Sequence, residues 1–120
     1  MHAGIWYQRR LAGIISFNYI DLGRQQTELG YWLGQAYQGK GLMTAACRAM
    51  TNYAFDHYKL HQVEIRCAVT NEKSRAIPER LGYETYGIAP QLDWSTGVYV
   101  DTIVYSMTAE DWHKREVPKQ

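Results

Sequence analysis

The sequence has no long hydrophobic run, little net charge and almost no cysteine. No apolar stretch approaches the ~18 residues of a membrane-spanning helix, and no charged-then-apolar leader is present. A formal net charge of +1 gives no electrostatic case for a nucleic-acid partner, which needs a concentrated basic face. Cys47 and Cys67 are expected to be buried thiols in a reducing compartment. We therefore expect a soluble, cytoplasmic protein with neither a nucleic-acid nor a membrane partner.

Several motifs of catalytic and metal sites are missing as well. The four histidines lack ligand spacing, and His57 and His61 straddle the end of a predicted helix without cysteine or carboxylate neighbours. The chain has neither a Ser-His-Asp set nor a Gly-x-Ser-x-Gly elbow. Its Gly39-Lys40-Gly41 loop lacks the four-residue spacer and the trailing Lys-Ser/Thr of a Walker A motif. The sequence thus predicts no metal ion.

What the chain does have is enough apolar and aromatic sequence for a folded core. Its 120 residues are 46% hydrophobic, which excludes a disordered chain. Ten tyrosines and four tryptophans are many for this length, and they favour strands and a partly aromatic cleft over a helical bundle. We predict a single domain over residues 1–120.

The apolar periodicity predicts a mixed α/β (α+β) fold. We predict strands at 3–8, 11–20, 27–33, 62–70, 83–88 and 98–107, with helices at 42–58 and 71–81. The first three strands form an antiparallel meander. Strand 27–33, helix 42–58 and strand 62–70 then form a β-α-β unit whose two strands are parallel.

The second half of the chain contains more turn and breaker signals. Helix 71–81 is expected to end at Gly82. Pro78 lies inside this segment and either kinks the helix or marks its first turn. We expect an irregular loop at 90–97 and a frayed tail from Glu110.

Residues 38–44, Gln-Gly-Lys-Gly-Leu-Met-Thr, join the third strand to the long helix and are the most informative part of the chain. The glycine pair lets the backbone approach a ligand closely. The first turn of the helix then offers unpaired N–H groups and the positive end of the helix dipole. Ligands of open α/β sheets gather at the carboxyl ends of strands, where this loop lies. The loop therefore predicts an anion site, most often one for phosphate.

Three motifs follow one another at a spacing typical of one family. They are Gly30-Tyr31-Trp32-Leu33, Tyr37-Gln38-Gly39-Lys40-Gly41-Leu42-Met43-Thr44 and Asn71-Glu72-Lys73-Ser74-Arg75-Ala76-Ile77-Pro78-Glu79-Arg80-Leu81-Gly82-Tyr83. With them the chain resembles the GNAT superfamily of acetyl-CoA-dependent N-acetyltransferases, and within it the ribosomal-protein-serine/alanine acetyltransferase branch. The likeness extends from the first strand to Met107. It implies a mostly antiparallel sheet with one parallel pair splayed at the acetyl-CoA site, and helices on the faces.

The chain departs from the family pattern in two places. The family has Gln or Arg three residues before the first loop glycine, where this chain has Ala36, and Gln35 or Gln38 can substitute. Family members also begin with a strand and two helices that wall the acceptor cleft, and Met1 stands after the position of those elements. The resemblance therefore implies an N-terminally truncated or minimal member. Its exposed sheet edge would favour pairing as a homo-oligomer.

The resemblance implies that the two parallel strands part and hold the pantetheine arm of acetyl-CoA like a substitute strand. Backbone groups of Tyr31, Trp32 and Leu33 would pair with that arm. The N–H near Leu33 would face the thioester oxygen, and such a donor is worth ~3 kcal/mol in the transition state. Lys40 adds charge beside the pyrophosphate or is a solvated side chain. The pyrophosphate would rest on Gln38, Gly39, Lys40, Gly41, Leu42, Met43 and Thr44.

Glu28 is the candidate general base, and the alternative is a solvated carboxylate on a strand face. Deprotonating a lysine of pKa ~10.4 at pH 7 costs ~4.6 kcal/mol, against ~1 kcal/mol for an α-amine of pKa ~7.8. Weak base machinery therefore favours a protein N-terminus as acceptor. Polyamines, aminoglycosides and other small amines stay open.

Ser74 is the candidate for protonating the leaving thiolate, directly or through water. Other GNAT branches use a tyrosine seven residues after the motif asparagine, where this chain has Pro78. The alternative for Ser74 is a helix N-cap. The resemblance implies that Asn71 binds a pantetheine amide, and the alternative is an Asx turn.

The acceptor side is expected to include Asp93-Trp94, Asp101 and Tyr105, with surface ion pairs as the alternative for the aspartates. Neither cysteine is expected near the cleft, so we predict direct attack of the amine on the thioester without an acyl-enzyme. Two other functions stay open, namely a non-catalytic CoA-binding or dimerising remnant and a nucleotide-binding regulator. Thiol release with a panel of amines tests the first, and competition between ATP and acetyl-CoA tests the second.

Overall fold

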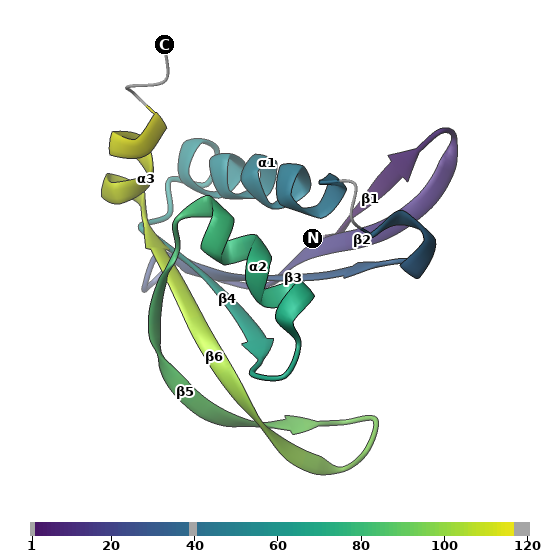
Figure 1. Ribbon diagram of the computed structural model, residues 1–120. Helices are drawn as coiled ribbons and strands as arrows, with labels where there is room; N and C mark the ends of the chain where they lie inside the picture. Colours follow the sequence, from purple (N-terminus) through teal and green to yellow (C-terminus); the bar gives the residue numbers. More distant parts are fainter. Residues whose placement is uncertain (1, 39–40, 117–120) are drawn as a thin grey trace.

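The computed structural model describes residues 2–38 and 41–116, which form a six-stranded sheet with helices packed on it (Figure 1). The strands lie in the order β1-β2-β3-β4-β6-β5. No helix of the described segments is long and apolar enough to cross a membrane. The elements are β1 (His2–Tyr7), β2 (Arg10–Asp21), β3 (Gln26–Leu33), η1 (Gln35–Tyr37), α1 (Leu42–Asp56), β4 (Gln62–Ala68), α2 (Glu72–Leu81), β5 (Glu84–Asp93), β6 (Val98–Thr108) and α3 (Ala109–Glu116).

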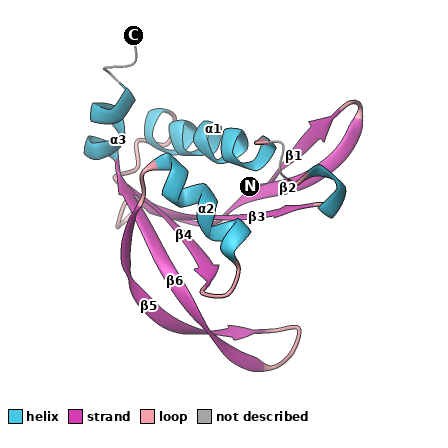
Figure 2. Ribbon diagram, in the orientation of Figure 1, coloured by secondary structure: helices cyan, strands magenta, loops and turns pink. Residues whose placement is uncertain are grey.

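The topology confirms the predicted fold class. Strands β1, β2 and β3 form an antiparallel meander, β3 and β4 are parallel, and β6 pairs antiparallel with both β4 and β5. Helix α1 connects β3 to β4, so the predicted β-α-β unit is present. Both α1 and α2 cover the same face of the sheet (Figure 2). The core between these helices and the sheet includes Phe17, Leu29, Met43, Cys47, Val63, Ile65 and Tyr105.

Local signals explain where the helices begin and end. In α1 the buried residues recur every three or four positions, and Cys47 is buried in this stripe. Both cysteines are free and buried, as predicted, and burial raises the pKa of the Cys47 thiol to about 12. Asn71 caps α2, and Gly82 ends it with a left-handed φ of 87°. Pro78 lies in the interior of α2 rather than in its first turn.

The expected irregular loop at 90–97 is wrong, because β5 runs on to Asp93 and a short turn at 94–97 joins it to β6, which begins at Val98. Asp93 holds the turn: its carboxylate accepts from the N–H and the hydroxyl of Ser95 at 3.0 and 2.6 Å. The N–H of Gly97, whose φ is 74°, donates to the carbonyl of Asp93 at 2.7 Å. Pro90 is tolerated because β5 is an edge strand. The hairpin curves away from the helices at the bottom of Figure 1.

The expected frayed tail from Glu110 is wrong for residues 110–116, which belong to α3, and residues 117–120 lie outside the described part of the chain. Trp112 is the anchor, with only 1% of its surface exposed. Its indole Nε1 donates to Oδ1 of Asn52 in α1 at 2.7 Å, and its ring centroid lies 6.5 Å from that of Phe55. One large apolar side chain therefore docks an otherwise charged segment on α1.

Candidate active site

Strands β3 and β4 pair for only part of their length. The last residues in register are Leu29 and Ile65, although β3 continues to Leu33 and β4 to Ala68. Helix α2 lies over this region, on the side that carries α1 (Figure 1). The two strands therefore part at their carboxyl ends, as the resemblance implied.

The inner edge of β3 turns backbone groups toward this gap. The N–H of Gly34 donates to the carbonyl of Ala12 in β2 at 2.7 Å. Bonded and unbonded positions alternate along an antiparallel ladder, so the N–H and C=O of Leu33 point the other way, toward β4. Those of Tyr31, two residues earlier, do the same. The Leu33 carbonyl accepts from Nε2 of Gln38 at 3.3 Å. The N–H of Leu33 faces the gap.

The first turn of α1 fits an anion. Gly41 precedes it with a φ of 75°, and no side chain caps the helix. The first N–H groups of an α-helix have no partner inside the helix. Thr44 Oγ1, in the same turn, is buried and has no hydrogen-bond partner among the described residues. An orphaned hydroxyl beside unpaired amides suits a phosphate. Gly39 and Lys40, also predicted here, lie outside the described residues.

The side chains of the other predicted cofactor residues point in different directions. Trp32 is 64% exposed, whereas Tyr31 is partly buried beneath α2. At the start of α1, Leu42 is half-buried and Met43 belongs to the core. A ligand shared by these residues would therefore contact mostly their backbone groups.

Tyr31, Cys67 and Ser74 meet beside the gap, although they are far apart in the sequence. Ser74 Oγ lies 3.4 Å from the Tyr31 hydroxyl and 3.4 Å from Cys67 Sγ. The Tyr31 hydroxyl is 3.6 Å from the same sulfur. Burial is the main cause that raises the pKa of Tyr31, so the phenol keeps its proton. This cluster places a hydroxyl donor next to the unpaired ends of β3 and β4.

The alternative given for Ser74 and the expectation for the cysteines are both wrong. Ser74 is not the N-cap of α2, because Asn71 holds that position and accepts from the Ser74 N–H at 3.1 Å. The Ser74 hydroxyl is thereby left to contact Tyr31. Cys67 does lie near the proposed cleft, because the alternation of β4 points its side chain toward α2. Cys67 is only 3% exposed, and its hydrogen-bond contacts within the described residues are the hydroxyls of Tyr31 and Ser74, so it lacks the activating base of a nucleophilic thiol.

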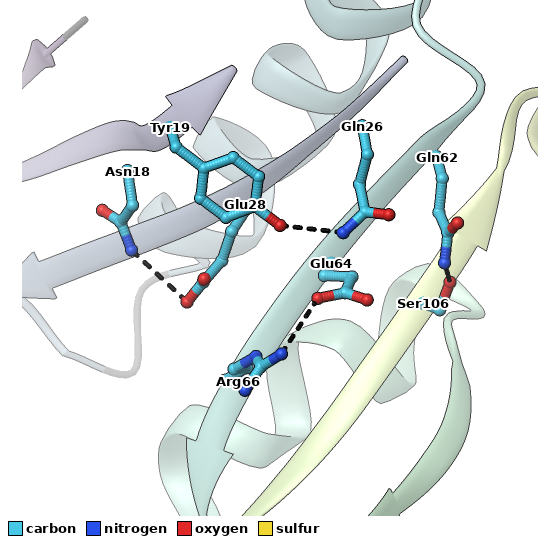
Figure 3. Close-up of polar contacts among 8 residues, drawn as sticks. All are labelled: Asn18, Tyr19, Gln26, Glu28, Gln62, Glu64, Arg66 and Ser106. Carbon is cyan, nitrogen blue, oxygen red and sulfur yellow. Dashed lines mark hydrogen bonds and ion pairs between the residues drawn. The ribbon is translucent and has the colours of Figure 1, made fainter. Parts of the chain in front are cut away.

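Glu28 lies on the opposite face of the sheet, in a row of polar residues shown in Figure 3. Its carboxylate accepts from Nδ2 of Asn18 at 3.4 Å, and Glu64 stands directly opposite it on β4. Glu64 in turn pairs with Arg66 at 3.4 Å. Burial raises the pKa of Glu28, Arg66 and Asn18 partly oppose this, and the charge of Glu64 adds to it. A carboxyl with a raised pKa suits general-base work.

Sequence reasoning missed the neighbours of Glu28. The available signal for Glu64 and Arg66 is the period-two alternation of β4, which puts them on the face away from the helices. Asn18 gives no such signal, because it stands at a bulge between Phe17 and Tyr19 where the register shifts.

Gly30 makes room for Asn18. A Cβ at this position would stand 2.6 Å from Asn18 Oδ1, closer than real side chains approach. Asn18 is held there by Ser16, whose hydroxyl donates to Oδ1 at 3.1 Å. The glycine of the Gly-Tyr-Trp-Leu motif thus lets an amide reach Glu28.

The residues expected on the acceptor side do not gather at this site. Tyr105 is buried on the helix side and donates to Glu79 at 2.7 Å, so its expected place on the acceptor side is wrong, whereas Asp101 is exposed on β6. Asp93 binds its own turn, and the hydrogen bonds from Ser95 lower its pKa. Trp94 is 87% exposed in that turn. Within 2–38 and 41–116, no three His, Cys, Asp or Glu side chains converge as metal ligands do.

Comparison with known proteins agrees with the sequence motifs. The family model described as an acetyltransferase (GNAT) domain matches residues 4–84, more than half of the chain. A Bacillus subtilis (strain 168) protein that bears the name of a ribosomal N-acetyltransferase, YdaF, is 40% identical over 112 residues, which are 93% of this chain and 61% of YdaF. The ribosomal-protein-serine acetyltransferase of Escherichia coli (strain K12) is 30% identical over 102 residues, 85% of this chain and 57% of that protein.

A solved structure gives the same picture. RimL, a ribosomal L7/L12 alpha-N-protein acetyltransferase in complex with coenzyme A, matches with a TM-score of 0.78 at 28% identity. The match covers 87% of this chain and 59% of RimL. The chain thus spans about six-tenths of the length of the relatives that it matches.

Proposed function

This chain belongs to the GNAT acetyltransferase family, and we propose that it binds acetyl-CoA and transfers the acetyl group to a primary amine by direct attack. The observation that carries the proposal is the parting of β3 and β4 after Leu29 and Ile65, next to the uncapped start of α1. The free main-chain edge of β3 suits the amide-bearing pantetheine arm of acetyl-CoA, and the start of α1 suits its diphosphate.

In this account the diphosphate lies on the N–H groups of the first turn of α1, with the Thr44 hydroxyl as a further donor. The pantetheine arm lies along β3 and pairs with its inner edge. The N–H of Leu33 then faces the thioester oxygen, where charge develops during attack. One such preorganised donor contributes ~3 kcal/mol to the transition state.

Glu28 is proposed as the general base that takes up the proton of the attacking amine through intervening waters, because it lies five residues before Leu33 on β3, roughly 16 Å away along the strand. Its raised pKa brings it closer to the pKa of an amine, although it stays a weak base. An α-amine of pKa ~7.8 needs far less help than a lysine of pKa ~10.4. We therefore propose a protein N-terminus as acceptor, in keeping with the named relatives.

Ser74 is proposed as the donor to the leaving group. Its hydroxyl passes a proton to the coenzyme A sulfur and takes one from water, while the amine proton leaves through Glu28. One C–S bond breaks and one C–N bond forms, and the products are an amide and a free thiol. Asn71 keeps the Ser74 backbone in place as the cap of α2.

The test is release of free thiol from acetyl-CoA with short peptides that begin with serine or alanine. The same peptides with a blocked N-terminus and one internal lysine are the acceptor control. We expect release with the free peptides and at least tenfold less with the blocked ones. Glu28→Gln should lower turnover by ~10²–10⁴-fold. Glu110→Gln, an exposed carboxylate on α3, should leave it unchanged.

Two other outcomes would overturn the enzymatic account. Coenzyme A binding by calorimetry without thiol release for any amine would identify a non-catalytic CoA-binding protein. Efficient displacement of acetyl-CoA by ATP would identify a nucleotide-binding regulator instead.

A further inference from the structure

We propose that Tyr31 is a positioning residue that fixes the Ser74 hydroxyl for its work at the leaving group. The inference rests on the proposed function, because Ser74 matters in this way only if acetyl transfer occurs. It assigns to the Tyr31 side chain a role that the backbone contacts of β3 do not include.

The first observation is a gap in the hydrogen bonding of α2. In an α-helix the N–H of each residue donates to the carbonyl four residues earlier. Residue 78 is proline, which has no N–H, so the carbonyl of Ser74 lacks its helical partner. The hydroxyl of Tyr31 donates to this carbonyl oxygen at 3.1 Å. A side chain from β3 thus replaces the hydrogen bond that Pro78 removes.

The second observation concerns the side chain of the same serine. Ser74 Oγ lies 3.4 Å from the Tyr31 hydroxyl oxygen and 3.4 Å from Cys67 Sγ, and its single proton can be donated to only one of them at a time. The phenol donates its one proton to the Ser74 backbone, so toward the Ser74 side chain it can act only as an acceptor, and it orients that hydroxyl until the serine proton turns to the leaving sulfur. Both groups of Ser74 are tied to one atom of a strand that lines the gap.

These contacts place the start of α2 beside the gap between β3 and β4. Tyr31 lies two residues beyond Leu29, on the part of β3 that no longer pairs with β4. Its hydroxyl reaches across to the first turns of α2 and holds that helix beside the opening. Without this contact the Ser74 carbonyl, which already lacks an N–H from residue 78, would also lose its Tyr31 donor, and the Ser74 hydroxyl would keep Cys67 as its remaining contact.

The test is a double-variant cycle in which replacing Pro78 restores the backbone N–H that proline lacks. Tyr31→Phe should lower kcat for thiol release with acetyl-CoA and a serine-terminated peptide about tenfold, with KM for acetyl-CoA changed less than twofold. Pro78→Ala supplies an N–H that can reach the Ser74 carbonyl. The double variant should therefore recover at least half of the kcat lost in Tyr31→Phe, whereas Pro78→Ala alone stays near wild type.

Tyr83→Phe is the matched control. Tyr83 is another buried tyrosine, and its hydroxyl lies 2.7 Å from Thr51 Oγ1 in the core. Its loss should destabilise the fold without lowering kcat per folded molecule. A merely structural role for Tyr31 predicts the same behaviour in Tyr31→Phe.

The outcomes distinguish failure of the Tyr31 positioning role from failure of the proposed acetyl transfer. Normal kcat in Tyr31→Phe, or a loss that Pro78→Ala fails to restore, overturns the positioning role while thiol release by the wild type upholds the proposed function. Absence of thiol release from the wild type overturns the proposed function and the positioning role with it.

Discussion

Leu29 and Ile65 are the last residues of β3 and β4 to face each other across the parallel pair. Beyond them β3 exposes a main-chain edge, and α1 begins without a side-chain cap. On the other side of the gap, α2 brings in the Ser74 hydroxyl. The place where a sheet stops pairing thus becomes the place where backbone donors, a helix terminus and a hydroxyl converge.

Thr44→Val should strengthen the fold and weaken coenzyme A binding. Thr44 Oγ1 is buried without a partner among the described residues, and leaving such a group unpaired costs ~1–3 kcal/mol. Because the same hydroxyl is proposed to contact the diphosphate, its loss should lower affinity about 5–10-fold. Urea unfolding and calorimetry measure the two effects, and Thr70→Val, at an exposed threonine, is the control. A less stable variant with unchanged affinity would remove Thr44 from the site.

The acidic limb of kcat/KM should lie above the ordinary glutamate pKa of about 4.5, because burial raises the pKa of Glu28. The base works when ionised, so activity falls as pH drops through the raised pKa. Asn18→Ala removes a hydrogen bond that lowers this pKa and should move the limb to higher pH. A limb that moves to lower pH, or that is unchanged in Glu28→Gln, would contradict the assignment.

The raised pKa of Glu28 can also be tested through the pH dependence of stability, without an activity assay. A folded-state pKa above the unfolded value contributes stability that is present at low pH and lost as pH rises through the folded pKa. Glu28→Gln should therefore raise the free energy of unfolding relative to wild type at pH 7, and this difference should shrink below pH ~4. Urea unfolding at the two pH values measures it.

Gly30→Ala should lower both stability and turnover. The new Cβ would stand 2.6 Å from Asn18 Oδ1, so Asn18 must move away from Glu28. Because the clashing atoms belong to the end of the flexible Asn18 side chain, which can swing away, we expect a stability loss of ~1 kcal/mol, the low end for overpacking. The double variant with Asn18→Ala should regain most of the stability but not the turnover. Gly23→Ala, whose Cβ would have its nearest neighbour at 3.4 Å, is the control. Additive stability losses in the double variant would refute the clash.

Trp112→Ala should destabilise the fold by ~3–5 kcal/mol, the usual cost of emptying a large buried site. The side chain is 1% exposed and its indole donates to Asn52. Trp94→Ala is the control, because Trp94 is 87% exposed and its loss should change stability by less than ~0.5 kcal/mol. Chemical denaturation compares them. Equal, small effects would mean that α3 is not docked through Trp112.

The sequence predicted the sheet and the loop-helix junction because their signals are local. Alternation along β4, with Val63, Ile65 and Cys67 on one face, and the glycines before α1 depend on neighbouring residues alone. The hairpin over 90–97 was hidden because Pro90 resembles a loop signal unless the strand is known to lie at an edge.

The rest of the site depends on contacts over long sequence separations. Tyr31 and Ser74 are brought together only because β3 and β4 part and α2 packs over the gap. The side chain of Asn18 does not follow the period-two alternation of β2, because a bulge shifts the register at this residue. The cytoplasmic location, the homo-oligomer and the roles of the site residues stay predictions.

The most direct test of the account is residue-resolved amide hydrogen exchange with and without coenzyme A. The N–H of Leu33 faces the gap, whereas that of its neighbour Gly34 is already bonded to Ala12. Saturating coenzyme A should slow exchange at Tyr31 and Leu33 at least tenfold and leave Gly34 nearly unchanged. Binding of coenzyme A without protection of Tyr31 and Leu33 would contradict the claim that it lies along β3.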